Sequence, residues 1–248
     1  LDDVVLATDI LSDILQNSLF DDVELERERN VVLQEIGQAI DTPDDIIFDH
    51  FQQRAYPDQA IGRPVLGQPG VVSELTRHDI AGFVSKNYTN ERLVFSVAGN
   101  VEHEEIVELV KTKFVLLPCD NQPSLLEPAN YKGGDFRKDQ KLEQIHIIIG
   151  FPNVSYDHED FYAYQVLSML LGGGMSSRLF QEVREKRGLA YSIQSFTTSY
   201  RDGGLMGIYA GTGEYFIEEM LPVISGGLNK LTHVDLEQEV ERSKTQLK

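Results

Sequence analysis

The sequence predicts an α+β fold, and three observations support this class. Apolar residues recur at helical spacing through most of residues 2–55. Short apolar runs typical of strands occur in both halves of the chain and are clearest in the second half. Residues 118–135 (PCDNQPSLLEPANYKGGD) are polar and contain Pro and Gly, a composition typical of a linker between two parts of a chain.

The elements of the first half follow from local signals. A helix is expected to begin after Thr42, because Pro43 is favourable at the first helical position. Another is expected after Thr76, whose hydroxyl can cap it, with Asp79 three residues further on as an imperfect capping box. The expected helices are 2–18, 22–40, 43–55, 76–88 and 101–114, a Gly- and Pro-rich loop fills 56–75, and the one expected strand is 91–100.

The second half alternates the same two kinds of element. Gly188 stands where a helix is expected to end, because glycine readily adopts the left-handed conformation of that position. Residues 201–204 (RDGG) predict the turn of a hairpin. The expected strands are 143–151, 190–200 and 204–212, and the expected helices are 158–171, 176–187 and one that begins near Glu214.

Composition narrows the possible partners and metal sites. The 248 residues carry a formal charge of −18 and contain no basic cluster, which argues against a nucleic acid or an anionic membrane as partner. No run of 18 apolar residues predicts a membrane span. The single cysteine, Cys119, excludes an internal disulfide and any cysteine-rich zinc pattern. A metal site in this chain would therefore use His, Asp or Glu.

The segment ELERERNVVLQEI, residues 24–36, carries three glutamates on one stripe of its expected helix. At about 100° per residue, Glu24, Glu28 and Glu35 lie close together around the helix axis. The neighbouring apolar stripe is formed by Leu25, Val32 and Ile36. Glu28 and Glu35 are therefore expected beside a buried edge, where a carboxylate must be paired or bound to a metal. A salt-bridged surface helix is the alternative interpretation.

Three segments, in order, resemble the insulinase/pitrilysin family of inverted-zincin metallopeptidases, in its processing-peptidase-like bacterial and mitochondrial branch. They are ERERNVVLQEI, the run from IGRPVLGQPG to VAGNVEHEEI, and LGGGMSSRLFQEVREKRGLAYSI. The resemblance implies two homologous α/β domains with mostly antiparallel sheets flanked by helices, both incomplete in this chain. It divides the chain into residues 1–118 of the first, zinc-bearing domain, a linker at 119–135, and residues 136–248 of the second domain.

A weak internal repeat agrees with two homologous domains. VELERE (23–28) and VDLEQE (234–239) align at an offset of 211 residues, which places Glu35 opposite Gln246. Chance similarity between two acidic helices is the alternative. The chain also begins without Met and ends inside a helical pattern, so both ends are expected to be cut from a longer protein.

The resemblance assigns roles to the two outer glutamates of ERERNVVLQE. It implies that Glu35 binds the catalytic Zn²⁺ and that Glu28 supports a zinc-bound histidine from the second shell. Such a zinc takes three protein ligands and leaves a position open for water. The family's H-x-x-E-H segment would supply two histidines and the general base. The chain does not contain it, because no pair of its six histidines has the required spacing. The remaining ligands and the general base are therefore expected outside this chain.

Arg184 and Tyr191, in REKRGLAY, match the arginine and tyrosine that the family presents to bound substrate across an enclosed chamber. Arginine offers fixed donors to a peptide carbonyl or to a developing oxyanion, and a phenol can add one more. The alternative interpretation is a cation at a helix C-terminus and a tyrosine in the core.

Three other features have structural interpretations. Gly172-Gly173-Gly174 precede a helix, but no G-x-G-x-x-G or G-K-[ST] pattern follows, so a tight turn is expected and a nucleotide site is not. His146 alternates with isoleucines on a strand and is expected to be a satisfied strand histidine. His158 stands at a helix start among carboxylates, and no metal role is expected for it.

Together these observations predict part of a zinc-dependent endopeptidase that hydrolyses extended or unfolded peptides and, when full length, is a zinc metalloendopeptidase. The alternative is a non-catalytic partner or scaffold subunit of the same family. A peptide substrate and a homodimer or a heterodimer with a related subunit are expected as partners. The resemblance favours a bacterial cytoplasm and leaves the mitochondrial matrix and the periplasm open.

Overall fold

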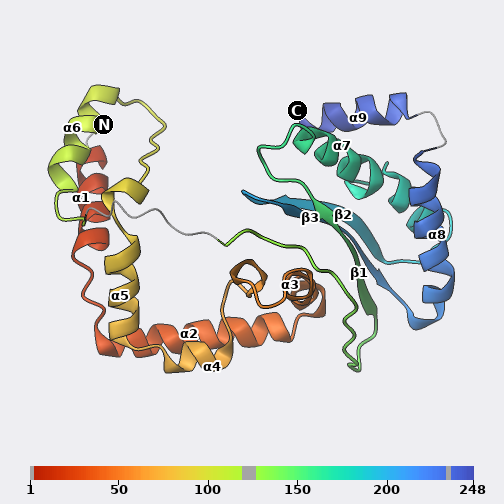
Figure 1. Cartoon of the computed structure of the whole chain (residues 1–248), viewed down its shortest axis with the longest axis horizontal. Coiled ribbons are helices and arrows are strands. Elements are labelled where there is room, and N and C mark those ends of the chain that lie inside the picture. Colours follow the sequence, from red (N-terminus) through yellow and green to blue (C-terminus); the bar gives the residue numbers. More distant parts are fainter. Residues whose placement is uncertain (1–2, 119–126, 233–235) are drawn as a thin grey trace. The chain divides into compact units, whose positions relative to one another are not determined.

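The computed structural model describes residues 3–118, 127–232 and 236–248. Within it the chain forms two compact units, each built from segments that are not contiguous in sequence (Figure 1). The first unit contains residues 1–36 and 68–126, and the second contains residues 37–67 and 127–248. No helix in the described part of the chain is long and apolar enough to cross a membrane.

The regular elements of the first unit, within its described residues, are all helices or 3₁₀ turns. The expected helices are confirmed, and the loop expected at 56–75 contains the short helix α4 as well as, in its second-unit part, the 3₁₀ turn η1 (Ala60–Gly62). The helices are α1 (Asp3–Gln16), α2 (Asp22–Ile40, whose last four residues belong to the second unit), α4 (Pro69–Glu74), α5 (Arg77–Asn87) and α6 (His103–Lys113), with a 3₁₀ turn η2 (Asn90–Arg92). Thr76 and Asp79 form the complete capping box at the start of α5, because each side chain accepts from the other's backbone N–H.

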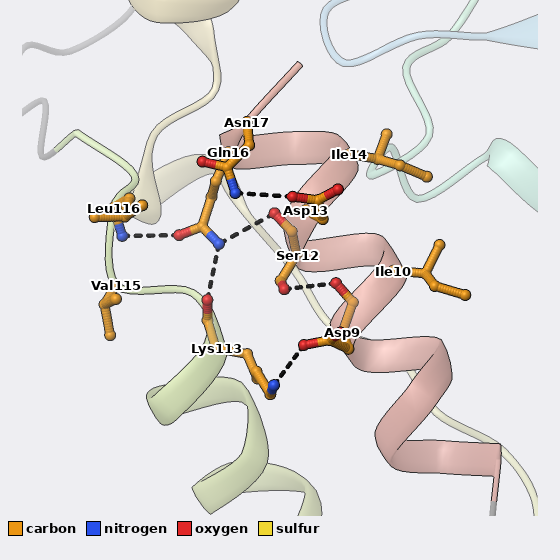
Figure 2. A pocket seen from close by; sticks show the side chains of 10 residues that line it. All are labelled: Asp9, Ile10, Ser12, Asp13, Ile14, Gln16, Asn17, Lys113, Val115 and Leu116. Atoms are coloured by element: carbon orange, nitrogen blue, oxygen red, sulfur yellow. Dashed lines mark hydrogen bonds and ion pairs between the residues drawn. The ribbon is translucent and has the colours of Figure 1, made fainter. Parts of the chain in front are cut away.

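Polar contacts join α1 to the end of α6 around a small hollow (Figure 2). The Gln16 amide donates to the carbonyl of Lys113 at 2.8 Å and accepts from the backbone N–H of Leu116 at 2.7 Å. The Lys113 ammonium pairs with Asp9. Ile10 and Ile14 point away from α6 and remain about half exposed. The side of α1 that meets α6 is therefore polar.

The strand expected at residues 91–100 is not formed, so that prediction is wrong for this chain. Residues 93–98 are extended but form no ladder with any described residue. Val94 and Val97 are 88% and 50% exposed, and the ring of Phe95 meets the ring of Phe114 with centroids 4.5 Å apart. The apolar pattern identifies a segment suited to a strand, but a strand exists only where a neighbour supplies its hydrogen bonds.

The second unit is built around an antiparallel three-stranded sheet in the order β1-β3-β2. The strands are β1 (Ile145–Asn153), β2 (Ser192–Ser199) and β3 (Gly204–Thr212). All three were expected from sequence. The hairpin of β2 and β3 is confirmed, with Ser199 opposite Gly204 and the N–H of Tyr200 donating to the carbonyl of Gly203 at 2.7 Å.

One face of this sheet carries the main hydrophobic core. Helix α7 (Phe161–Gly172), the π-helical turn η3 (Phe180–Glu185) and α8 (Ile217–Lys230) lie on this face (Figure 1). The side chains of Ile208, Val183, Met220 and Ile224 are at most 1% exposed there. Alternate residues of each strand point to this face, as the two-residue period of a strand requires.

The opposite face packs against α3 (Pro43–Ala55) through aromatic rings. Phe48 stacks on Tyr209 with ring centroids 5.6 Å apart and meets Phe196 edge-on at 5.1 Å. Phe51 also meets Phe196 edge-on. Gly150 lies against the Phe51 ring, and a Cβ atom there would overlap that ring. Glycine is therefore required at this position of β1 for close approach of α3.

The 3₁₀ turn η4 (Glu214–Phe216) leads into α8. The second unit ends with α9 (Glu237–Leu247). Helix α9 packs on α7, and Arg178 forms a two-pronged ion pair with Glu239. Glu239 is the repeat counterpart of Glu28. The first residues of the repeat segment VDLEQE, Cys119 and residues 119–126 of the predicted linker lie outside the described residues. The boundaries of two homologous domains remain a proposal.

Candidate functional site

The two glutamates expected to serve a metal lie two turns apart on α2. Seven residues correspond to nearly two full turns of an α-helix, so Glu28 and Glu35 lie on almost the same side of the rod. Both side chains are exposed. The expected buried edge is largely absent, because Ile36 is the only buried residue of the neighbouring apolar stripe. The prediction that Glu28 and Glu35 lie beside a buried edge is therefore wrong, whereas the metal binding expected of Glu35 stays a prediction.

The other glutamates of the same helix are engaged. Glu24 binds Arg27 at 2.5 Å, and Glu26 binds Arg29 at 3.0 Å. Arg29 also donates to the carbonyls of Val72 and Ser73, which ties α2 to α4. Glu28 and Glu35, in contrast, form no ion pair or side-chain hydrogen bond with any residue that the structure describes. The ion pairs of a salt-bridged surface helix therefore include Glu24 and Glu26, whereas the carboxylates of Glu28 and Glu35 remain available to another ligand.

The described residues supply at most part of a zinc site. They contain no group of three His, Cys, Asp or Glu side chains placed to hold one metal ion. A catalytic zinc needs three protein ligands. The free carboxylate of Glu35 fits the role of one such ligand, and the carboxylate of Glu28 fits that of a hydrogen-bond acceptor for a ligating histidine. This donor set is compatible with a shared zinc site whose other ligands come from elsewhere.

Arg184 belongs to the π-helical turn η3 in the second unit. It is exposed, and its guanidinium lies over the ring of Phe180 at 4.8 Å. Its carbonyl accepts from the N–H of Gly188 at 3.0 Å, and Gly188 has the positive φ of +63° expected for the residue that ends a helix. The prediction of Gly188 as the helix-ending residue is confirmed, whereas the π-helical form of the segment was not expected.

Tyr191 begins the run into β2 and is fixed through its backbone. Its N–H donates to the carbonyl of Gly211 in β3 at 2.9 Å, while its side chain is 63% exposed. The alternative interpretation of Tyr191 as a core tyrosine is therefore wrong. Arg184 and Tyr191 flank Gly188, so one short segment presents both polar groups to solvent.

A hollow of about 390 Å³ lies beside Tyr191 in the second unit, and sequence analysis did not identify it. Its lining includes Asp44, Glu143, His146 and Tyr209. His146 shares a hydrogen bond of 2.9 Å between its Nδ1 and the Tyr209 hydroxyl, which confirms it as a satisfied strand histidine. Burial raises the pKa of the Tyr209 phenol above its ordinary value. These residues become neighbours only through the strand register and the docking of α3, so no local motif announces them.

The remaining sequence features have structural roles. Residues 173–177 form the turn that follows α7, and a side chain at Gly173 would overlap Met169. His158 accepts from the backbone N–H of Asp160 at 3.1 Å, at the start of α7. Neither feature lies in a group of metal-binding side chains among the described residues.

Comparison with known families identifies the chain. The family model described as "Insulinase (Peptidase family M16)" matches residues 2–69, and the model described as "Peptidase M16 inactive domain" matches residues 74–247. The chain belongs to peptidase family M16. The resemblance inferred from the sequence is thereby confirmed.

Curated relatives support the same branch of the family. An "Uncharacterized zinc protease" of Rickettsia felis is 40% identical over 243 residues, which cover 98% of this chain and 59% of the relative. "Mitochondrial-processing peptidase subunit beta" of Mus musculus is 33% identical over 258 residues, with coverage of 99% and 53%. The chain therefore spans somewhat more than half the length of the curated relatives that it matches.

Solved structures confirm the fold. A peptidase M16 inactive domain from Pseudomonas fluorescens superposes with a TM-score of 0.89 at 20% identity and covers 97% of this chain and 59% of that one. A chain of Complex III2 from Candida albicans gives a TM-score of 0.89 at 21% identity, with coverage of 99% and 61%. At these identities the likeness establishes the α+β architecture and no activity.

Proposed function

We propose that the chain is part of a zinc-dependent endopeptidase that hydrolyses extended or unfolded peptides in an enclosed chamber. Membership of family M16 and relatives named zinc proteases support the reaction class. The observation that carries the proposal onto specific residues is the contrast along α2. Glu28 and Glu35 have no ion-pair or side-chain hydrogen-bond partner among the described residues, whereas Glu24 and Glu26 on the same helix are ion-paired.

In this proposal Glu35 is the carboxylate ligand of the zinc. Glu28 would accept a hydrogen bond from a zinc-bound histidine and so fix the orientation of that ring. One rigid helix would carry both groups, which keeps their spacing constant. When bound, the zinc would polarise the scissile carbonyl and lower the pKa of a bound water toward about 7. The general base that takes the proton from water is not among the residues of this chain.

Arg184 and Tyr191 would bind the peptide. The guanidinium can donate to a peptide carbonyl or to the oxyanion that forms when water attacks, and the exposed phenol can donate beside it. An extended peptide suits such donors, because its carbonyls are regularly spaced and unpaired. The chain's formal charge of −18 favours basic peptides over acidic ones, since like charges repel.

A non-catalytic partner or scaffold subunit is the second candidate function. The description "Peptidase M16 inactive domain" for the model that matches residues 74–247 favours it for that part of the chain. Either function is compatible with a homodimer or with a heterodimer of related subunits. The carboxylates of Glu28 and Glu35, which have no partner among the described residues, are available to a metal, as the enzyme requires.

The experiment that tests the enzyme compares two isosteric variants of the full-length protein. Glu35→Gln removes the charge of the proposed ligand, and Glu24→Gln removes a charge from the same helix that already has a partner in Arg27. We expect Glu35→Gln to abolish hydrolysis of a fluorogenic unfolded peptide with unchanged circular dichroism, and Glu24→Gln to retain hydrolysis. Equal turnover of wild type and Glu35→Gln would refute the assignment, and absence of turnover and zinc in the wild type would favour the scaffold.

A further inference from the structure

Arg184 is held differently from the other cations of its segment. The three others each reach a carboxylate, in the pairs Arg178–Glu239, Lys186–Glu182 and Arg187–Glu219. Arg184 forms no ion pair or side-chain hydrogen bond with the residues that the structure describes. Its contact is the aromatic face of Phe180, 4.8 Å from the guanidinium carbon to the ring centroid.

The kind of contact determines which atoms of the guanidinium stay available. A carboxylate binds the N–H groups in the plane of the guanidinium and so occupies its donors. An aromatic ring binds the planar face and leaves those in-plane donors open. Arg178 is an arginine of the first kind, with its Nε 2.9 and 3.0 Å from the carboxylate oxygens of Glu239. Arg184 is of the second kind, and its donors face solvent.

The Phe180 ring is itself anchored. Phe180 and Arg184 belong to the same π-helical turn, η3. Leu179, directly before this turn, and Val183, within it, are at most 1% exposed. Phe180 is half-buried and packs against the main core of the second unit. The ring is thus a rigid platform, whereas an arginine without a contact would sample many rotamers.

We propose that Phe180 is a positioning residue, which holds the Arg184 guanidinium by its face and keeps the N–H donors of that group free for substrate. The inference rests on the substrate role of Arg184 given under the proposed function. It adds a residue with no polar atom to the binding machinery and assigns it an effect that acts only through Arg184.

The test compares substitutions of Phe180 in the full-length protein, with kcat and KM measured on a peptide substrate. Phe180→Leu keeps an apolar side chain but removes the ring face, and we expect kcat/KM to fall about two- to fivefold, the range of an exposed cation–π contact. Phe180→Tyr keeps the ring face, and we expect this variant to have the kcat/KM of the wild type. Tyr164→Leu is the matched control, because Tyr164 packs against the same core and carries no cation on its ring among the described residues.

A double-mutant cycle separates positioning from loss of stability. If Phe180 acts through Arg184, Phe180→Leu causes no further loss of kcat/KM once Arg184→Ala is present. If Phe180 only supports the fold, the same substitution lowers kcat/KM by the same factor in both backgrounds, and the inference is overturned. A kcat/KM of Phe180→Tyr as low as that of Phe180→Leu also overturns the inference.

The outcomes distinguish this inference from the proposal on which it rests. Zinc binding and hydrolysis that depend on Glu35, with kcat/KM unaffected by Arg184→Ala, would remove the substrate role of Arg184 and with it the role of Phe180, but not the peptidase. Loss of kcat/KM in Arg184→Ala with no effect of Phe180→Leu would refute only the positioning role. If kcat/KM depends on Glu35, on Arg184 and on the Phe180 ring, the peptidase and the positioning role of Phe180 are both supported.

Discussion

Replacing Gly150 by alanine tests how the aromatic face of the sheet holds α3. The added methyl group would overlap the ring of Phe51 on α3, which also meets the ring of Phe196 on β2. Forcing extra volume into a packed site costs about 1–3 kcal/mol. Alanine recovers about 0.5–1 kcal/mol, because it loses less backbone freedom on folding than glycine does. The midpoints of these two ranges give a net loss of about 1 kcal/mol in the free energy of unfolding.

The measurement is urea-induced unfolding, followed by circular dichroism in the far ultraviolet. Gly226→Ala in α8 is the matched control, because nothing lies within 4 Å of a Cβ atom at that position. There the same substitution should stabilise the helix by about 0.8–1 kcal/mol. Phe51→Leu combined with Gly150→Ala should be less harmful than the sum of the two, since the smaller side chain makes room. A Gly150→Ala variant as stable as wild type would refute the close packing of Phe51 on β1.

Two further predictions concern the second unit. Burial, aided by neighbouring Tyr200, Asp202 and Tyr131, raises the pKa of Tyr56 to about 12. The folded state therefore holds this proton more tightly than the unfolded state. The resulting stability is complete below pH 10 and is lost as the pH rises from 10 to 12. Tyr56→Phe should flatten that part of an alkaline unfolding curve and cost about 1–2 kcal/mol at neutral pH, because the hydroxyl donates to the Gly204 carbonyl at 3.1 Å. If the alkaline unfolding curve of Tyr56→Phe were the same as that of the wild type, the stabilising role of the Tyr56 hydroxyl would be contradicted. The Arg178–Glu239 pair should show a coupling of about 1 kcal/mol in a double-mutant cycle read by thermal unfolding, since both side chains are largely buried. A coupling indistinguishable from zero would show that α9 is held by other contacts.

Local signals predicted most of the elements. The helix starts at Pro43 and after Thr76, the helix end at Gly188 and the hairpin turn at residues 201–204 are each encoded within a few residues, and the structure confirms them. The one expected strand that does not form is the segment 93–98, whose apolar pattern is that of a strand. Its state depends on a pairing partner, which is a non-local property that no pattern within the segment contains.

The site was predictable only where residue types carry the chemistry. Glu28, Glu35, Arg184 and Tyr191 were identified through resemblance to a family, and their proposed roles still depend on it. The free state of the two glutamates follows from which arginines reach Glu24 and Glu26, a matter of side-chain geometry. The contact of Arg184 with Phe180 and the hollow beside Tyr191 arise from a π-helical turn and from the docking of α3, and sequence spacing predicts neither.

The most direct test of the zinc peptidase is the metal affinity of the full-length protein with single substitutions on α2. Equilibrium dialysis against buffered Zn²⁺, followed by elemental analysis, gives the zinc bound per chain. We predict one tightly bound zinc in the wild type and in Glu24→Gln, affinity reduced about 10–100-fold in Glu28→Gln, and near-complete loss in Glu35→Gln. Equal zinc affinity in all four proteins would contradict the assignment of α2 to the metal site.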